Sequence, residues 1–362
     1  MYLKNLFMKF FRCFSELNME FSSGTNLILG SNAQGKTSLL EAIYFLALAR
    51  SPRTNVEKEM VQYGCGGFLL KGWVEYSRSD SFPTRTKTIE IRWGKGKKKI
   101  IIDGIEAERV SELLGNLRVV FLSNDHFNLV TGGGSVKRRF LDIQISQWDR
   151  EYLHALQEYN VALRQRNELL RRSYVTDEEL YPWEVAMDKF SKIIVEARRK
   201  FLSKIAPFAV MLHNAITRDE NLEIRYVPSI EGDSLLKVLQ VNRKSDAEYG
   251  ATQRGPHRDD IEIKINRYPV RQYASRGQIR TCSFALIIAQ VYAMLEEHNE
   301  PPVLLADELL SELDSERSKK MVESIPKGIQ SFITSADTSL NETLGLNASL
   351  YFIRKGKIEK AG

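Results

Sequence analysis

The chain has 362 residues, 43% of them apolar, so it can bury one large core or two smaller ones, and its length favours two domains. A formal net charge of +6 and an isoelectric point near 9.0 favour an anionic partner such as nucleic acid. Three scattered cysteines exclude a disulfide scaffold, and no uninterrupted apolar run approaches the roughly 18 residues of a membrane span, so we predict a cytoplasmic protein.

The first third of the chain is rich in predicted strands. Apolar, β-prone residues occupy positions 3–14 and 18–21, and a short buried-strand pattern covers 26–29. A helix rich in Leu and Ala is expected at 38–49. Meander strands follow, separated by glycine-containing turns, at 73–76, 88–93 and 99–102.

The pattern becomes helical after the three glycines at 132–134. Apolar residues recur at spacings of three and four, so we predict two long antiparallel helices, at 139–170 and 183–216. Strand patterns return at 222–227 and 261–265, and a helix at 280–297 leads into a strand at 303–306. The sequence therefore predicts an α/β protein in which 1–122 and 222–362 form one domain and 123–221 an inserted, mainly helical arm domain.

A P-loop follows the strand predicted at 26–29. Residues 30–37 fit G-x-x-x-x-G-K-[ST] at every fixed position, with a strand before the motif and a helix after it. Glycines let backbone N–H groups surround phosphates, Lys36 would reach the β- and γ-phosphates, and the Thr37 hydroxyl would bind magnesium. We predict that ATP and Mg²⁺ are bound by Gly30, Ser31, Asn32, Ala33, Gln34, Gly35, Lys36, Thr37 and Ser38.

Two carboxylates end the apolar strand at 303–306. Asp307 is predicted to hold magnesium together with Thr37, and Glu308 to polarise the attacking water, so that Glu308, Lys36 and Asp307 form the predicted catalytic set. The alternative interpretation is that the two acids merely end a strand at the surface.

A serine-glycine segment precedes this acidic strand. Ser275, Gly277 and Gln278 open a helix and offer a hydroxyl, an unencumbered backbone and a helix N-terminus, which suit a γ-phosphate. The segment resembles the signature motif of ABC-type ATPases, and residues 311–314, ending at Asp314, look like their D-loop. That resemblance implies an ATP-dependent homodimer, in which the signature of one copy closes over the nucleotide of the other. An ordinary helix cap is the alternative.

The whole chain resembles the RecF family of bacterial DNA repair ATPases. The resemblance is carried by residues 3–14 leading into 30–42, then by 50–54, 121–142, 255–260, 275–280 and 307–314. The string at 255–260, Gly-Pro-His-Arg-Asp-Asp, is the most family-specific. The chain departs from the family pattern at 124–126, where Asn-Asp-His replaces Pro-Glu-Asp, at Glu308, where Asp is frequent, and at Arg276.

Membership of that family implies an ABC-type head and an ATP-dependent DNA clamp of recombinational repair, linked to replication and the SOS response. Such a clamp binds single-strand gaps and their duplex junctions, hydrolyses ATP weakly with stimulation by DNA, and works with RecO and RecR to load recombinase. The residues themselves show two basic clusters that could neutralise DNA phosphates. The first is Lys95 with Lys97, Lys98 and Lys99, and the second is Lys137 with Arg138 and Arg139. Arg53 could face the phosphates of ATP or form a plain salt bridge.

Two rival functions are weighed against this one. A transporter's nucleotide-binding subunit would carry a switch histidine some thirty residues past the acidic strand, whereas Thr334-Ser335 occupies that place and no histidine follows His298. The helical insertion and the string at 255–260 are foreign to transporters. A structural head like that of SMC proteins, with negligible turnover, stays open.

Overall fold

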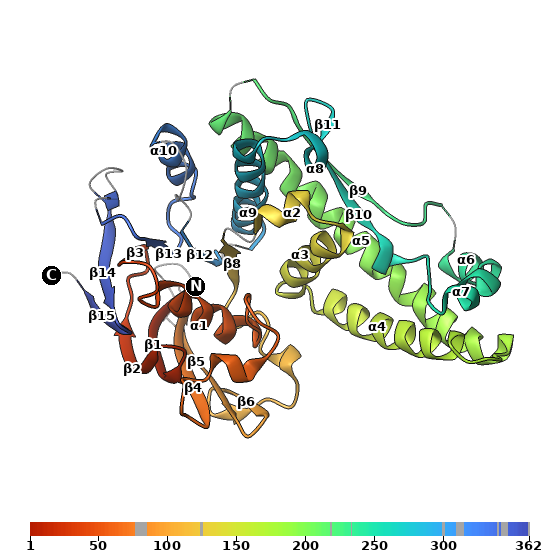
Figure 1. Ribbon diagram of the computed structural model, residues 1–362, viewed down its shortest axis with the longest axis horizontal. Helices are drawn as coiled ribbons and strands as arrows, with labels where there is room; N and C mark the ends of the chain where they lie inside the picture. The colour runs from red at the N-terminus through yellow and green to blue at the C-terminus, as the bar shows by residue number, and fades with distance from the viewer. Residues whose placement is uncertain are drawn as a thin grey trace. The chain divides into compact units, whose positions relative to one another are not determined.

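The computed structural model describes residues 1–76, 85–123, 126–217, 219–232, 234–298, 301–308, 315–338, 340–341 and 347–360. The chain divides into two compact units (Figure 1). Unit 1 comprises Met1–His126 and Phe284–Gly362, and unit 2 comprises Phe127–Ser283. This division differs from the predicted domains: the segment 222–283, assigned to the head from its strand patterns, belongs to unit 2 because its strands pair with one another.

Unit 1 contains an antiparallel sheet built from the predicted meander. Its strand order in the described residues is β2-β1-β4-β5-β6-β7. The strand expected at 3–14 is interrupted by a turn at Arg12 and Cys13, where Arg12 has a φ of 53°. The strands are β1 (Tyr2–Phe11), β2 (Phe14–Glu20), β4 (Gly67–Tyr76), β5 (Arg85–Gly94), β6 (Lys97–Ile102) and β7 (Ile105–Glu106).

A second, mostly parallel sheet of unit 1 carries the nucleotide motifs. Its order is β15-β14-β3-β13-β12-β8, and only β15 runs antiparallel to its neighbour among the described strands. β12 and β8 are buried along their whole length, as expected for strands covered on both faces. The strands are β3 (Thr25–Leu29), β8 (Val119–Leu122), β12 (Val303–Ala306), β13 (Ser331–Ser335), β14 (Ala348–Arg354) and β15 (Lys357–Lys360).

Helix α1 (Lys36–Leu48) contacts strands of both sheets, including β1, β4 and β5 on one side and β8, β12 and β13 on the other. Every residue from Leu39 to Leu48 is therefore buried, and the helix lacks a polar face. Its central position fixes where the loop before it lies. A further helix of unit 1, α10 (Ser315–Glu323), follows the acidic strand.

Unit 2 is built around two long helices, α4 (Arg150–Leu170) and α5 (Asp177–Ile216), which pack along each other (Figure 1). The single helix predicted at 139–170 is wrong. It is split into α3 (Gly134–Ser146) and α4, because the Asp149 side chain caps α4 by accepting a hydrogen bond from the Tyr152 amide.

Helix α5 begins earlier than the residue 183 predicted. Thr176 and Glu179 form a capping box, each side chain bonded to the other's backbone amide, so the helix starts at Asp177. Pro182 is accommodated inside the helix, close to this start. Where α4 and α5 are joined, a small apolar cluster of Leu169, Leu170 and Leu180 holds their ends together.

The rest of unit 2 is a small antiparallel sheet with short helices. β10 lies between β9 and β11, and α8 packs against β10, β11 and α2. The elements are α2 (Phe127–Thr131), β9 (Leu222–Val227), α6 (Leu235–Val241), α7 (Arg243–Tyr249), β10 (Asp260–Ile265), β11 (Tyr268–Pro269), α8 (Val270–Tyr273) and the start of α9 (Arg276–His298).

The boundary between the units falls within α9, after Ser283. Among the described residues, this helix alone is long and apolar enough to cross a membrane, over Arg276–Glu296, and 72% of its apolar stretch is buried inside the protein. Such burial is what the core helix of a soluble protein shows, so the length and composition of α9 are weak evidence for a membrane span.

Candidate nucleotide-binding site

The P-loop connects β3 to α1 in a path that requires its two fixed glycines. A Cβ atom on Gly30 would lie 2.5 Å from the carbonyl oxygen of Ile353 on β14. Gly35 has a φ of 115°, and a Cβ there would lie 2.7 Å from the Cys13 Sγ. Only glycine fits both positions without displacing backbone or neighbouring side chains.

Lys36 is folded back into this loop. The side chain is 3% exposed, and its Nζ donates hydrogen bonds to the carbonyl oxygens of Gly30 (2.7 Å) and Ser31 (3.1 Å). The N-terminus of α1 has no side-chain cap, so its first amides are available to an anion. Thr37 and Ser38 lie half-buried in the first turn of α1, while Ser31, Asn32 and Ala33 are exposed.

The acidic pair lies close to this lysine because of the strand order. β13 separates β3 from β12, and all three are parallel, so the loops at their carboxyl ends meet at one edge of the sheet. The Glu308 carboxylate is 3.7 Å from the Lys36 Nζ. The structure thus brings together the predicted catalytic residues Lys36 and Glu308, with Asp307 directly before Glu308.

Thr334, at the end of β13, orients both acids. Its buried hydroxyl donates to the Asp307 Oδ1 (2.8 Å) and accepts a hydrogen bond from the Glu308 amide (2.9 Å). Glu308 has a φ of 49°, a left-handed conformation that is uncommon outside glycine, asparagine and aspartate. From the sequence, Thr334 was noted only because it stands where a transporter would carry its switch histidine. The role of Thr334 in positioning Asp307 and Glu308 was missed.

The P-loop is also tied to the turn between β14 and β15. The Gln34 Oε1 accepts a hydrogen bond from the Lys355 amide (2.7 Å), and the Gln34 carbonyl accepts one from the Gly356 amide (3.2 Å). This contact joins residues more than 300 positions apart, so sequence patterns did not reveal it.

Arg53 lies beside a buried carboxylate. Its guanidinium is 3.7 Å from the Glu41 Oε2 of α1, and Glu41 also accepts hydrogen bonds from Arg12 (2.8 and 2.6 Å) and from the Ser51 hydroxyl (2.5 Å). The salt bridge weighed from the sequence is therefore present. The Arg53 side chain remains 46% exposed, so contact with a nucleotide stays a prediction.

The predicted signature motif forms a capping box at the start of α9, in unit 2. The Gln278 amide donates to the Ser275 hydroxyl (3.3 Å), and the Ser275 amide donates to the Gln278 Oε1 (2.8 Å). The Gly277 carbonyl accepts a bond from the Thr281 hydroxyl. Ser275 is exposed, whereas Asp314 and the rest of the predicted D-loop lie outside the described residues.

Comparison with known proteins identifies the family. The model of the RecF/RecN/SMC N-terminal domain matches residues 2–359. The DNA replication and repair protein RecF of Clostridium botulinum (strain ATCC 19397 / Type A) is 36% identical over 370 residues, which cover 99% of this chain and all of that protein. The chain belongs to the RecF family.

Solved structures agree with this membership. The structure of the recombination mediator protein RecF with ATP, described for the RecFOR pathway, is 33% identical with a TM-score of 0.89, covering 100% of this chain and 98% of that one. An Smc head domain from Pyrococcus furiosus is 16% identical with a TM-score of 0.59, covering 99% and 96%, and shares the fold. The prediction of an ABC-type α/β head with a helical second domain is confirmed.

In the family-specific string at 255–260, Gly255, Pro256 and Asp259 are buried inside unit 2, whereas Arg258 is exposed. The Asp259 carboxylate accepts hydrogen bonds from the Tyr226 hydroxyl, from the Ser229 amide (2.7 Å) and from Arg198 (3.3 Å). Burial raises the pKa of Asp259, although these donors oppose the shift. In this RecF-family chain, Asp259 holds β9, α5 and the string together, which is a structural role.

His257, in the same string, is held between two oxygens. Its Nε2 lies 3.0 Å from the Thr252 carbonyl and its Nδ1 lies 2.8 Å from the Tyr159 hydroxyl. Because a carbonyl can only accept, the ring donates from Nε2. When the ring is neutral, its Nδ1 accepts a hydrogen bond from the Tyr159 hydroxyl. Burial lowers the pKa of His257 to about 4.

The two basic clusters predicted from the sequence are partly used inside the protein. Lys137 is buried and donates to the Ile261 carbonyl (2.5 Å), and Arg138 donates to the Asp259 carbonyl (2.5 Å). Lys98 donates to the Ala49 carbonyl and pairs with Glu57. The exposed cations of these clusters are Lys95, Lys97, Lys99 and Arg139, of which Lys99 pairs with Glu106 (3.2 Å).

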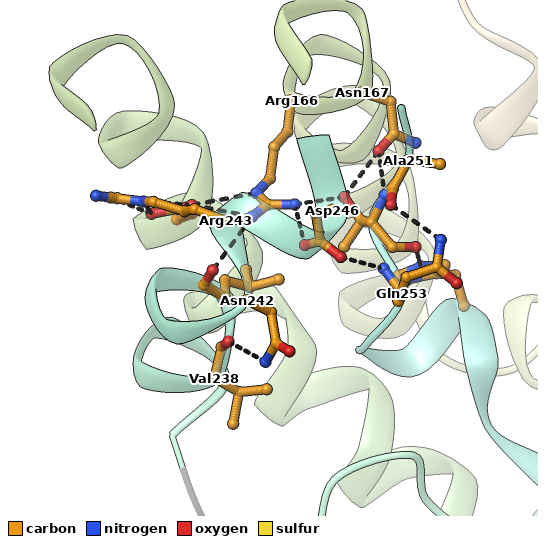
Figure 2. Close-up of polar contacts among 12 residues, drawn as sticks. Arg166, Asn167, Val238, Asn242, Arg243, Asp246, Ala251 and Gln253 are labelled. Carbon is orange, nitrogen blue, oxygen red and sulfur yellow. Dashed lines mark hydrogen bonds and ion pairs between the residues drawn. The ribbon is translucent and has the colours of Figure 1, made fainter. Parts of the chain in front are cut away.

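A second buried polar cluster of unit 2 surrounds Arg166 of α4 (Figure 2). This side chain is fully buried, and its guanidinium donates to Asp246 (2.8 Å), to the Thr252 hydroxyl (2.8 Å) and to Glu184 (3.1 Å). Arg243 pairs with the other side of Glu184 (2.6 Å). The cluster joins α4, α5 and α7 through charges that are fully paired.

Proposed function

We propose that this chain is an ATP-driven DNA clamp: it binds ATP with Mg²⁺, joins a second copy of itself around DNA, and hydrolyses the nucleotide to release it. The observation that carries the proposal is the approach of Glu308 to within 3.7 Å of the P-loop lysine, Lys36. If Asp307 and Glu308 merely ended a strand at the surface, Glu308 would have no reason to face a buried lysine at the end of a parallel sheet. The related RecF structure with ATP supports the same assignment.

The residues present fit ATP and magnesium. The first amides of α1 carry no side-chain cap and could bind phosphate, and the Thr37 hydroxyl and the Asp307 carboxylate are the oxygen ligands that Mg²⁺ prefers. The metal would neutralise charge on the phosphate oxygens. Lys36 would exchange its bonds with the Gly30 and Ser31 carbonyls for bonds with phosphate, and Glu308, freed from the lysine, would orient the attacking water.

The dimer would be completed by the capping box of α9. The Ser275 hydroxyl accepts the Gln278 amide and keeps its own hydrogen to donate to a γ-phosphate held by a second copy. The helix N-terminus adds backbone amides and a favourable dipole. Asp314 would belong to the same interface by resemblance. A closed two-fold pairing would bury two nucleotides.

The anionic partner would be DNA at single-strand gaps and junctions with duplex. A net charge of +6 and the exposed Lys95, Lys97 and Lys99 support phosphate contact without sequence reading. The named relatives are a DNA replication and repair protein and a recombination mediator of the RecFOR pathway. By the same kinship we propose cooperation with RecO and RecR in the cytoplasm, and a weak ATPase that DNA stimulates.

One assay compares the rival functions directly. ATP hydrolysis is measured with no DNA, single strands, duplex and gapped duplex of equal nucleotide concentration. We expect slow turnover without DNA and the strongest stimulation by gapped duplex. Turnover that ignores all DNA would favour the transporter-like alternative, and no turnover with any of them would favour a structural head.

A pair of Ser275 variants separates its capping role from contact with phosphate. Ser275→Asp keeps an N-cap acceptor but places a negative charge toward the γ-phosphate, whereas Ser275→Ala loses the cap at a cost of about 1 kcal/mol. We expect both to bind ATP and both to lose the ATP-dependent dimer, with only Ser275→Ala less stable to urea. A Ser275→Asp protein that dimerises normally would contradict the proposed role.

A further inference from the structure

The segment directly before the signature serine combines basic and aromatic residues. The ten residues 267–276 include three arginines and two tyrosines and contain no Asp or Glu. They form β11, α8 and the first residue of α9, all in unit 2 (Figure 1). We call the surface formed by Arg267, Tyr268, Arg271 and Tyr273 the basic-aromatic surface.

The two tyrosines of this surface are exposed and adjacent. Tyr268 is 63% and Tyr273 67% exposed, with ring centroids 5.7 Å apart and planes inclined at 61°. Val270 between them is buried and anchors α8 against the small sheet. Because an aromatic ring normally gains by burial, two adjacent exposed rings offer a surface that a ligand could cover.

The arginines are equally available. Arg267 and Arg271 are exposed, and neither makes a hydrogen bond or ion pair through its side chain within the described part of the chain. Among the acids nearby, Glu262 pairs with Lys264 and Arg225, Glu220 accepts from Gln278, and the exposed Glu223 of β9 accepts from Asn221 (3.4 Å). The positive charge of the surface is therefore not neutralised within the described residues.

Arg267 also occupies a backbone position that suits glycine. It and Asn266 form the two-residue turn between β10 and β11, with φ values of 70° and 51°. Both central residues of such a turn need positive φ, and glycine is preferred at the second. An arginine there costs turn stability, which favours a role for its side chain at the surface.

We propose that the basic-aromatic surface binds single-stranded DNA, with unpaired bases stacking on Tyr268 and Tyr273 and phosphates contacting Arg267 and Arg271. The chemistry favours single strands because base faces are open for stacking there and are covered in a duplex. This inference rests on the proposed DNA-clamp function and adds where, and by which contacts, the unpaired strand of a gap is held.

The test measures the affinity of the full chain for a fluorescent single-stranded oligonucleotide and for a duplex of equal length, with and without ATP. The double variant Tyr268→Ala/Tyr273→Ala should lose about tenfold or more in single-strand affinity, as expected from loss of base stacking, and less than about twofold in duplex affinity. Tyr268→Phe/Tyr273→Phe keeps both rings and should bind as the unmodified chain does.

A matched control removes two other exposed tyrosines, as Tyr63→Ala/Tyr249→Ala, which are 103% and 74% exposed. This variant should leave both affinities unchanged. The inference would be overturned if the two alanine double variants lost single-strand affinity equally. It would also be overturned if Tyr268→Ala/Tyr273→Ala lost only ATP binding or dimerisation. An unmodified chain that binds no DNA would overturn the proposed function as well, so the two failures are distinguishable.

The arginines are tested through salt dependence and stability. Arg267→Gln/Arg271→Gln should reduce the slope of log affinity against log salt by about 1.4 for single strands, the value for two phosphate contacts. Arg267→Gly should raise the melting temperature while weakening single-strand binding. An Arg267→Gly protein that is more stable and binds single strands with unchanged affinity and salt slope would contradict a role for this side chain.

Discussion

Two buried cations, Lys36 in unit 1 and Arg166 in unit 2, are held in opposite ways. Lys36 is bonded to backbone carbonyls of its own loop, and its nearest carboxylate is 3.7 Å away. Arg166 is bonded to two carboxylates, a hydroxyl and a carbonyl at 2.8–3.3 Å. A cation held by neutral oxygens can be transferred to a ligand at little cost, whereas one paired with buried carboxylates is part of the structure.

The same contrast separates the two most distinctive strings in the sequence. Residues 30–37 leave several side chains exposed and the α1 amides uncapped, while in residues 255–260 Asp259 and His257 are enclosed by partners. A family-specific string can therefore have either of two roles: it can stabilise the fold, or it can bind a ligand. Only the contacts of its side chains separate the two cases.

The largest expected effect comes from breaking the Arg166 cluster. Arg166→Met leaves Glu184 and Asp246 buried without their shared cation, so the free energy of unfolding should fall by about 3–5 kcal/mol. Urea unfolding monitored by circular dichroism measures the loss. ATP affinity of the folded fraction should be unchanged, and an unchanged stability would show that the paired charges contribute nothing.

Replacing Lys36 should have the converse effect. Lys36→Ala should reduce ATP affinity by about a hundredfold or more, because charged hydrogen bonds to phosphate contribute about 1.5–3 kcal/mol each, while stability changes little. Isothermal titration calorimetry with ATP and magnesium gives the affinity. Arg53→Ala tests the two roles left open for that residue: a large loss of ATP affinity would mean that Arg53 contacts the phosphates, and an unchanged affinity would mean that it only pairs with Glu41.

Acid should destabilise unit 2 through His257. Its pKa in the folded chain is about 4, below the ordinary value of about 6.5, so the unfolded chain takes up the proton first and stability falls as pH drops from about 6.5 toward 4. The contribution is at most about 3 kcal/mol. Urea unfolding of the unmodified chain and of His257→Gln at pH 7 and pH 4.5 isolates it, and parallel losses in both proteins would contradict the assignment.

A smaller effect is expected from Thr334. Thr334→Val removes the hydroxyl that bonds to Asp307 and to the Glu308 amide but keeps the side-chain shape, so turnover should fall about tenfold with ATP affinity nearly unchanged. Thr334→Ser retains the hydroxyl and should remain active. Steady-state ATPase rates check both, and a fully active Thr334→Val would remove Thr334 from the site.

What the sequence revealed depended on how local each pattern was. The strand before residues 30–37, the helix after them and the strand that ends before Asp307 were predicted correctly, because each is a short run with its own local pattern. The bond between Thr334 and Asp307 and the contact of Gln34 with the β14–β15 turn depend on which strands pair, and that is set by tertiary packing.

The errors in unit 2 have the same origin. The break at Asp149 and the start of α5 at Thr176 are set by single capping side chains, which a search for apolar periodicity overlooks. The segment 222–283 was assigned to the head because strand patterns alone do not say which sheet a strand joins.

The central claim is that nucleotide joins two copies of the chain through the P-loop of one and Ser275 of the other. Light scattering of Glu308→Gln with and without ATP and magnesium tests it most directly, since this variant should bind ATP but not hydrolyse it. We expect a monomer of 41.5 kDa without ATP and a stable species of twice that mass with it. A Glu308→Gln protein that is saturated with ATP and remains monomeric would contradict the account.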